Sequence, residues 1–209
     1  MPVHVPLYPV NLVLEGRRCL IVGGGTVATH KAVGLLACGA RVHVVAPEVA
    51  AELEARAEVT VERRPYRRGE LNGYRLVVAA TGDPAVNAAV LADGEEAGVW
   101  VNAADDIDNC TFTLPAVVRR GPVMVTVSTG GHSPALARWL KERVADCVGP
   151  EYEVLAELLS AERDAIRTSG RSTEGLNWQS ALESDMLDLI RAGQVRKAKE
   201  RLQACLSSS

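Results

Sequence analysis

Short apolar runs alternate with amphipathic segments over residues 18–102, and this order is the clearest structural signal in the chain. The runs are rich in Val, Ile and Leu, and they cover residues 18–22, 41–46, 59–62, 74–80 and 99–102. Apolar residues at helical spacing follow three of the runs, at residues 26–38, 50–56 and 84–97. Runs without polar alternation suit strands buried on both faces. The pattern therefore predicts an α/β fold, a Rossmann-like parallel sheet with helices on both faces.

The pattern changes after residue 108. Apolar residues at 111–118 and 123–128, joined by a turn, are typical of an antiparallel pair. A helix is expected from about residue 135 to residue 147, because Ser133 and Pro134 suit its first turn. Three apolar stripes in residues 151–209 predict a small helical bundle, or an arm that lies on a partner. The expected parts are a Rossmann domain (1–115), a small α+β segment (116–149) and a helical C-terminal domain (150–209).

Three glycines, residues 23 to 25, stand between the first strand and the first helix. Together with Ala28 they fit the G-x-G-x-x-A form of the dinucleotide-binding fingerprint. Gly23 permits a tight turn, Gly25 lets the backbone approach a pyrophosphate, and Ala28 lets the helix pack closely on the strand. The positive end of the helix dipole favours phosphate at this point. A glycine turn that only joins strand to helix is the alternative.

Polar residues gather where the predicted strands end, and in a parallel sheet those ends share one edge. Glu48 follows the second strand slightly later than the usual ribose-binding acid, and no arginine follows at once to bind a 2′-phosphate. NAD is therefore favoured over NADP, although Glu48 could also be a solvated loop carboxylate. Asp105 is the first carboxylate after the fifth strand and is a candidate base. We interpret Asp106 and Asp108 as parts of a solvated turn.

A second glycine turn, Gly130 and Gly131, precedes the helix that begins near residue 135. Such a turn presents backbone N–H groups to an anion. His132 could serve as a base or a metal ligand, and on sequence alone a loop histidine without a role is the more frequent case. Several basic residues could meet a polyanionic substrate or could simply be solvated: Arg63, Arg64, Arg67, Arg68, Arg119, Arg120, Arg138, Lys141 and Arg143.

Composition narrows the class of protein further. The 209 residues carry a net charge of −3, which gives no indication of nucleic-acid binding. Five cysteines at irregular spacing argue against a disulfide framework or a zinc knuckle and favour a reducing cytoplasm. We expect no bound metal. No signal peptide is recognisable, and no apolar run approaches the 18 residues that a membrane span needs.

Three segments taken together resemble the precorrin-2 dehydrogenases, a family that includes the N-terminal part of sirohaem synthase. They are residues 22–32 (Val-Gly-Gly-Gly-Thr-Val-Ala-Thr-His-Lys-Ala), residues 79–87, and residues 102–115 followed by 127–138. The resemblance covers roughly residues 5–150. It implies oxidation of precorrin-2 to sirohydrochlorin with NAD⁺, insertion of Fe²⁺ in some members, and a homodimer whose subunits exchange the segment after the Rossmann domain.

The resemblance also implies roles for individual residues. Asp105 lies in the family's N-x-x-D pattern and is the catalytic candidate, as base or proton relay. The cofactor residues implied are Gly24, Gly25, Thr26, Val27, Pro47, Glu48 and Thr81, to which the fingerprint adds Gly23. The candidate substrate residues are Asn102, Thr129, Gly130, Gly131 and His132. Thr129 replaces a serine that the family associates with phosphorylation and chelatase activity. Two alternatives stay open: a bifunctional dehydrogenase and ferrochelatase, and an NAD-sensing regulatory module.

Overall fold

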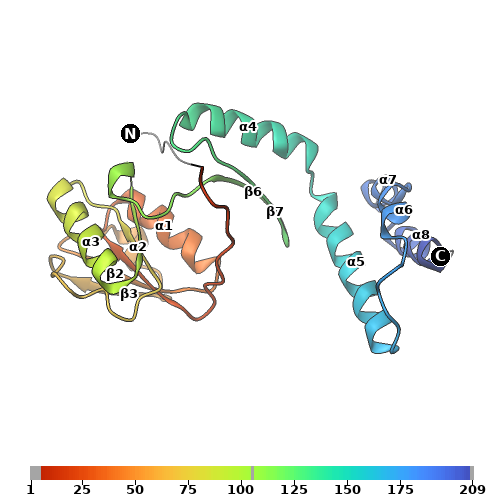
Figure 1. Cartoon of the computed structure of the whole chain (residues 1–209), viewed down its shortest axis with the longest axis horizontal. Coiled ribbons are helices and arrows are strands. Elements are labelled where there is room, and N and C mark those ends of the chain that lie inside the picture. The colour runs from red at the N-terminus through yellow and green to blue at the C-terminus, as the bar shows by residue number, and fades with distance from the viewer. Residues whose placement is uncertain (1–5, 105, 208–209) are drawn as a thin grey trace. The chain divides into compact units, whose positions relative to one another are not determined.

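The computed structural model describes residues 6–104 and 106–207 and divides the chain into two compact units (Figure 1). The first unit comprises the residues up to 114 together with 130–133. The second comprises residues 115–129 and those from 134 onward. Each unit has its own architecture and is described separately.

The first unit is built on a five-stranded, wholly parallel sheet of strand order β3-β2-β1-β4-β5. Its strands are β1 (Arg18–Val22), β2 (Arg41–Ala46), β3 (Val59–Arg63), β4 (Leu76–Ala79) and β5 (Trp100–Ala103). Its helices are α1 (Thr26–Leu36), α2 (Ala51–Glu54), α3 (Pro84–Ala97) and the 3₁₀ turn η1 (Ile107–Asn109). The predicted Rossmann-like sheet is confirmed, with α2 shorter than the segment expected from the sequence.

Two apolar clusters fill the two faces of this sheet. On one face, Ala28 and Ala32 of α1 and Leu53 of α2 pack on β1, β2 and β4. On the other face, Val90 of α3 packs on β4 and β5. Close contact is needed there, because a Cβ at Gly94 of α3 would lie 2.2 Å from a methyl carbon of Val101. The β3–β4 connection contains no helix and covers part of this second face with loop residues.

The second unit begins with an antiparallel hairpin, β6 (Ala116–Arg120) and β7 (Val123–Val127). Five helices follow it: α4 (Pro134–Cys147), α5 (Glu151–Thr168), α6 (Trp178–Leu182), α7 (Met186–Arg191) and α8 (Val195–Ser207). The last four share one apolar core that includes Leu155, Met186 and Leu202. The expected hairpin and helical C-terminal region are both present. In the described residues, no helix combines the length and the apolar character that crossing a membrane would require.

Candidate functional site

The turn between β1 and α1 gives each of its three glycines a different environment. Gly23 has a φ of +120°, and a Cβ there would lie 2.2 Å from the carbonyl oxygen of Ala80. At Gly24, a Cβ would lie 2.1 Å from the carbonyl oxygen of Glu48. At Gly25, a Cβ would meet no atom within 4 Å. Neighbouring backbone therefore requires glycine at the first two positions, whereas the third faces open space.

The N-terminus of α1 starts at this open position. Gly25 is its N-cap and has no side chain with which to satisfy the free N–H groups of the first turn. The described residues of that turn include no acid. The helix start is held in place because Ala28 is fully buried and the Thr29 hydroxyl donates to the Gly25 carbonyl at 3.1 Å. Free N–H groups and the positive end of the dipole suit a phosphate, so the position fits the pyrophosphate of a dinucleotide.

The loop after β2 lies directly against the glycine turn. The N–H of Ala50 donates to the carbonyl oxygen of Gly24 at 2.8 Å. Pro47 and Glu48 precede that bond and are exposed. The structure thus brings together Gly24, Pro47 and Glu48, three residues predicted from the sequence to contact the cofactor. The N–H of Gly23 also donates to Val45 at 2.9 Å, which ties the turn to β2 itself.

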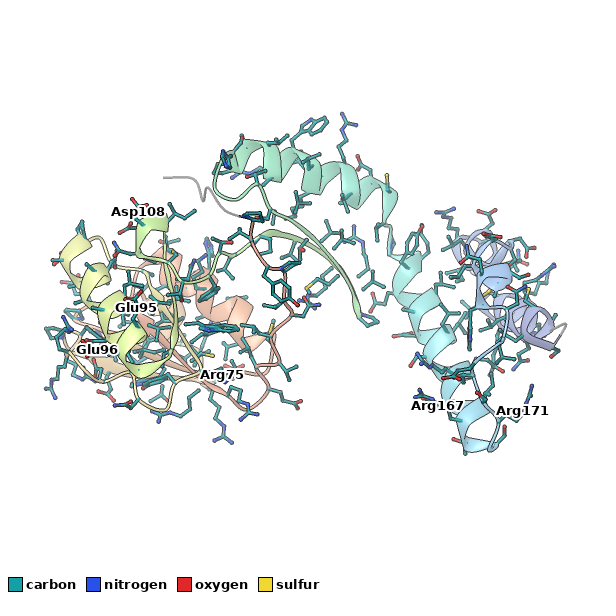
Figure 2. The ribbon with its side chains drawn as sticks, viewed as in Figure 1. Arg75, Glu95, Glu96, Asp108, Arg167 and Arg171 are labelled. Atoms are coloured by element: carbon teal, nitrogen blue, oxygen red, sulfur yellow. The ribbon has the colours of Figure 1, made fainter. Side chains whose placement is uncertain are left out.

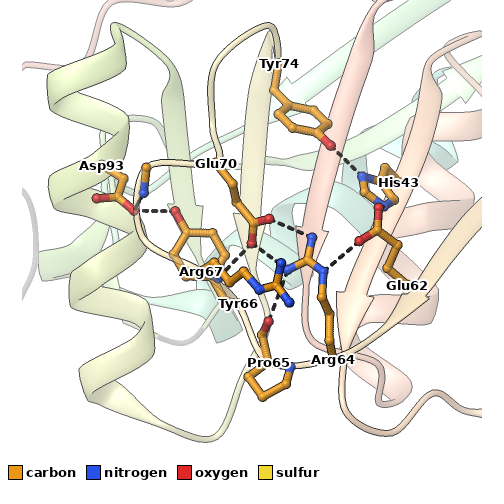
Figure 3. A network of polar contacts seen from close by, with 10 residues as sticks. His43, Glu62, Arg64, Pro65, Tyr66, Arg67, Glu70, Tyr74 and Asp93 are labelled. Carbon is orange, nitrogen blue, oxygen red and sulfur yellow. Dashed lines mark hydrogen bonds and ion pairs between the residues drawn. The ribbon is translucent and has the colours of Figure 1, made fainter.

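The arginines at the carboxyl end of β3 form ion pairs with carboxylates (Figure 3). Arg63, the last residue of β3, lies 2.6 Å from Glu54, the last residue of α2, and forms an ion pair with it. Arg64 follows and lies 2.6 Å from both Glu62 and Glu70. Burial raises the pKa of the Glu70 carboxyl, but hydrogen bonds from Arg64 and the neighbouring backbone outweigh it and lower that pKa. These glutamates therefore neutralise much of the charge of residues 63–68, the basic loop that the sequence suggested as a contact for a polyanionic substrate.

Thr81, another predicted cofactor residue, lies two residues beyond the end of β4. Its hydroxyl donates to the side-chain oxygen of Asn87 at 2.8 Å. Asn87 is buried in α3, and Asp83 caps that helix by accepting from the N–H of Ala85 at 2.9 Å. The hydroxyl of Thr81 is thus held in one direction, next to Ala80, whose carbonyl contacts the glycine turn.

The end of β5 is braced by a thiol and an amide. The side chain of Asn102 is buried and donates to the carbonyl oxygen of Phe112 at 3.0 Å. The N–H of Ala103 donates to the sulfur of Cys110 at 3.1 Å, and burial raises the pKa of that thiol. These bonds close the loop 104–109, whose Asp105 lies outside the described residues. Sequence reasoning missed Cys110, because a single cysteine without spaced partners gives no motif.

The second glycine turn groups with the first unit. Gly130, Gly131 and His132 belong there, whereas Thr129 belongs to the second unit. Both glycines have positive φ, +58° and +81°, so this loop needs them for its path. His132 is exposed. Across residues 6–104 and 106–207, no group of three or more His, Cys, Asp or Glu side chains is placed to hold a metal ion.

A parallel sheet with an open glycine turn at its carboxyl edge defines a dinucleotide-binding protein, and comparison with known proteins agrees. Residues 10–116 match the family model described as Putative NAD(P)-binding, and residues 120–146 match Sirohaem biosynthesis protein central. The solved structure of SirC, precorrin-2 dehydrogenase, is similar with a TM-score of 0.68 and 30% identity, covering 95% of this chain and 98% of that one. The chain belongs to this family of NAD(P)-binding sirohaem biosynthesis proteins.

Longer relatives contain the same region. The siroheme synthase of Chromobacterium violaceum is 40% identical over 201 residues, which are 94% of this chain and 43% of that protein. The siroheme synthase of Nitrosomonas eutropha is 37% identical over 208 residues, 97% of this chain and 44% of that protein. The chain therefore spans less than half the length of these relatives.

Proposed function

We propose that this chain is an NAD-dependent dehydrogenase that oxidises precorrin-2 to sirohydrochlorin in sirohaem biosynthesis. The observation that carries the proposal is its similarity to SirC, precorrin-2 dehydrogenase, over 95% of this chain and 98% of that one. The open position at Gly25 and the free N-terminus of α1 supply the cofactor half of the site. Bound NAD⁺ would accept a hydride, and a residue of this chain would take the proton released with it.

The charges at the cofactor edge favour NAD over NADP. An NADP site usually offers an arginine to the 2′-phosphate. Here Arg63 and Arg64 are already paired with acids, and the exposed Glu48 would repel a phosphate. The same carboxylate can accept hydrogen bonds from the two ribose hydroxyls of NAD.

Asp105 is the catalytic residue that we propose, as base or proton relay. Its neighbours in the chain are held at the carboxyl edge of the sheet. The N–H of Ala104 donates to Ala79 of β4 at 2.8 Å, and that of Asp106 donates to Ala103 of β5 at 3.3 Å. A carboxylate at this edge can take a proton from a substrate at the nicotinamide. Asn102, Thr129, Gly130, Gly131 and His132 stay the proposed substrate contacts, suited to a ligand rich in carboxylates.

The second unit supports a homodimer. None of the residues of α4 is buried, and its Leu136 and Trp139 are 47% and 51% exposed. An apolar helix face of this kind is typically covered by a partner. We propose that a second copy of this chain covers it, with residues 116–149 as the dimerisation segment and 150–209 as the helical C-terminal domain. Sedimentation at micromolar concentration should therefore give twice the mass of one chain.

The cysteines support a reducing compartment, and we propose the cytoplasm. All five are free, and Cys19 is fully buried in the sheet. Burial raises the pKa of the Cys19 thiol to about 11, so the reactive thiolate is scarce there at neutral pH.

The deciding assay mixes the protein with precorrin-2 and NAD⁺ and follows the absorbance of NADH. Asp105→Asn should slow turnover by about 10²–10⁴-fold, the usual contribution of a general base, and leave NAD⁺ affinity unchanged. Asp108→Asn removes the same charge from the same loop and serves as the matched control. Normal turnover by Asp105→Asn would show that Asp105 is not the base.

The same preparation distinguishes the two alternatives. Sirohydrochlorin and Fe²⁺ are added without NAD⁺, and a shift of the absorption spectrum that needs the protein would demonstrate ferrochelatase activity. NAD⁺ binding without any turnover of precorrin-2 would instead identify an NAD-sensing regulatory module.

A further inference from the structure

Three arginines lie at the amino ends of neighbouring strands of the sheet, the ends opposite the glycine turn. Arg18 and Arg41 open β1 and β2 and are paired in register. Arg75 directly precedes β4, and its N–H donates to the carbonyl oxygen of Arg18 at 2.8 Å. Figure 2 labels Arg75 among the side chains of the first unit. Neighbouring strands lie about 4.8 Å apart, so the three backbone positions span roughly 10 Å.

The three side chains share one face of the sheet. Side chains alternate between the faces along a strand, so Arg18 lies on the face of Leu20, and Arg75 on the face of Val77. Leu20 and Val77 both belong to the apolar cluster of the second face, as does Val45, which lies on the face of Arg41. The β3–β4 connection covers part of this face with loop residues and without a helix, and all three arginines are exposed. We call Arg18, Arg41 and Arg75 the arginine row.

The arginine row has no carboxylate partner in the described part of the chain. Across residues 6–104 and 106–207, no ion pair within 4 Å involves any of the three, whereas Arg63 and Arg64 lie 2.6 Å from glutamates. Glu58 directly precedes β3, the strand next to β2. Within the described residues it makes no ion pair with Arg41. Like charges on adjacent strands repel, so the row costs stability unless an anion offsets it.

The central arginine of the row is held in position by its surroundings. The guanidinium carbon of Arg18 lies 4.4 Å from the centre of the Tyr74 ring. The hydroxyl of Tyr74 lies 2.5 Å from Nδ1 of His43, whose Nε2 is 3.1 Å from Glu62 (Figure 3). Stacking on a ring that is itself fixed reduces the entropy that Arg18 would lose on binding a ligand.

Nearby acids do not cancel the charge of the row. Glu62 and Glu70 are the carboxylates of this network, and Arg64 pairs with both. The charge of these two glutamates is therefore partly offset by Arg64. The guanidiniums of the row come from the starts of three adjacent strands and have no ion pair within the described residues.

We propose that the arginine row binds a small anion with at least two phosphate or carboxylate groups, at a site separate from the cofactor edge. Guanidinium binds both groups through two parallel hydrogen bonds, and three such forks in a row suit a ligand with more than one charged group. The strand starts and the glycine turn lie at opposite ends of β1, so both ligands can be bound at once.

Calorimetric titration of the full chain tests this, with pyrophosphate and citrate as the phosphate and carboxylate probes. Each titration is run with and without saturating NAD⁺, because pyrophosphate could also occupy the N-terminus of α1. At least one probe should bind in the presence of NAD⁺, and the probe that binds more tightly identifies the ligand group. Arg41→Gln and Arg75→Gln should each weaken that binding about tenfold, as the loss of one charge-assisted contact predicts.

Arg171→Gln is the matched control, since it removes the same charge from an exposed position in the second unit. It should leave the affinity for the probes unchanged, and circular dichroism should show that all variants are folded. The proposal is overturned if neither probe binds in the presence of NAD⁺. Equal binding by wild type and by the Arg41→Gln, Arg75→Gln double variant would overturn it as well.

Discussion

Replacing Gly25 with alanine should separate cofactor binding from folding. Its φ of −83° and ψ of −167° are open to alanine, and the added Cβ would meet no protein atom within 4 Å. Gly-to-Ala changes at compatible positions alter the free energy of unfolding by only about 0.4–1 kcal/mol. The same methyl group would stand where a pyrophosphate approaches the turn. We expect the NAD⁺ dissociation constant to rise at least about tenfold, or about 1.4 kcal/mol.

Two neighbouring glycines provide the controls for this prediction. Gly34→Ala, also with nothing within 4 Å, lies inside α1 and should raise stability by up to about 1 kcal/mol without affecting NAD⁺. Gly23→Ala would place a Cβ 2.2 Å from Ala80 at a φ of +120°, so it should destabilise the fold itself. Urea unfolding and NAD⁺ titration are measured on all three variants. Wild-type NAD⁺ affinity in Gly25→Ala would refute a pyrophosphate at this position.

Two further predictions concern single carboxylates. Asp93 is 3% exposed and accepts hydrogen bonds from Tyr66, Arg68 and Gly69. These bonds outweigh the effect of burial and lower the pKa of its carboxyl in the folded state. The ionised carboxyl therefore stabilises the fold above about pH 4, the pKa of an unfolded aspartate, and this stabilisation is lost as the pH falls through the lower pKa of the folded state. Asp93→Asn should lower the free energy of unfolding by about 2–4 kcal/mol at pH 7 and by less at pH 3, measured in urea. Glu48→Gln should narrow the preference for NAD⁺ over NADP⁺ severalfold in competitive titration, and an unchanged ratio would remove Glu48 from the ribose site.

The parallel sheet was predictable because its evidence is local. Buried strands such as β1 and β4 are continuous apolar runs, and Asp83 with Pro84 marks the start of α3 in the sequence. The β3–β4 connection was harder to predict. Its covering of the sheet depends on Leu71, which is fully buried, and on Tyr66, whose hydroxyl reaches Asp93 of α3 at 2.5 Å. Tyr66 and Asp93 are 27 residues apart, and a periodic pattern of apolar residues does not predict a contact between residues so distant in the sequence.

The candidate site was predictable in its position but less so in its details. The fingerprint located the glycine turn, yet it did not show that Gly24 must accommodate the backbone of Glu48. The sequence likewise marked Arg63 and Arg64 as cations available to a ligand. Their acids come from separate segments, Glu54 from α2 and Glu70 from the β3–β4 connection, so only the folded chain reveals the pairing.

Positive charge is arranged differently at the carboxyl and the amino ends of the strands, and the difference suits two kinds of ligand. At the carboxyl edge the guanidinium of Arg63 is neutralised by an acid, and attraction for phosphate comes from the backbone N–H groups of α1. Backbone donors cannot swing away, so they bind the pyrophosphate of a cofactor in one fixed geometry. At the amino edge, Arg41 and Arg75 are long, exposed side chains that can adjust to anions of different shape. One sheet can therefore hold a precisely placed cofactor at one end and a less strictly selected anion at the other.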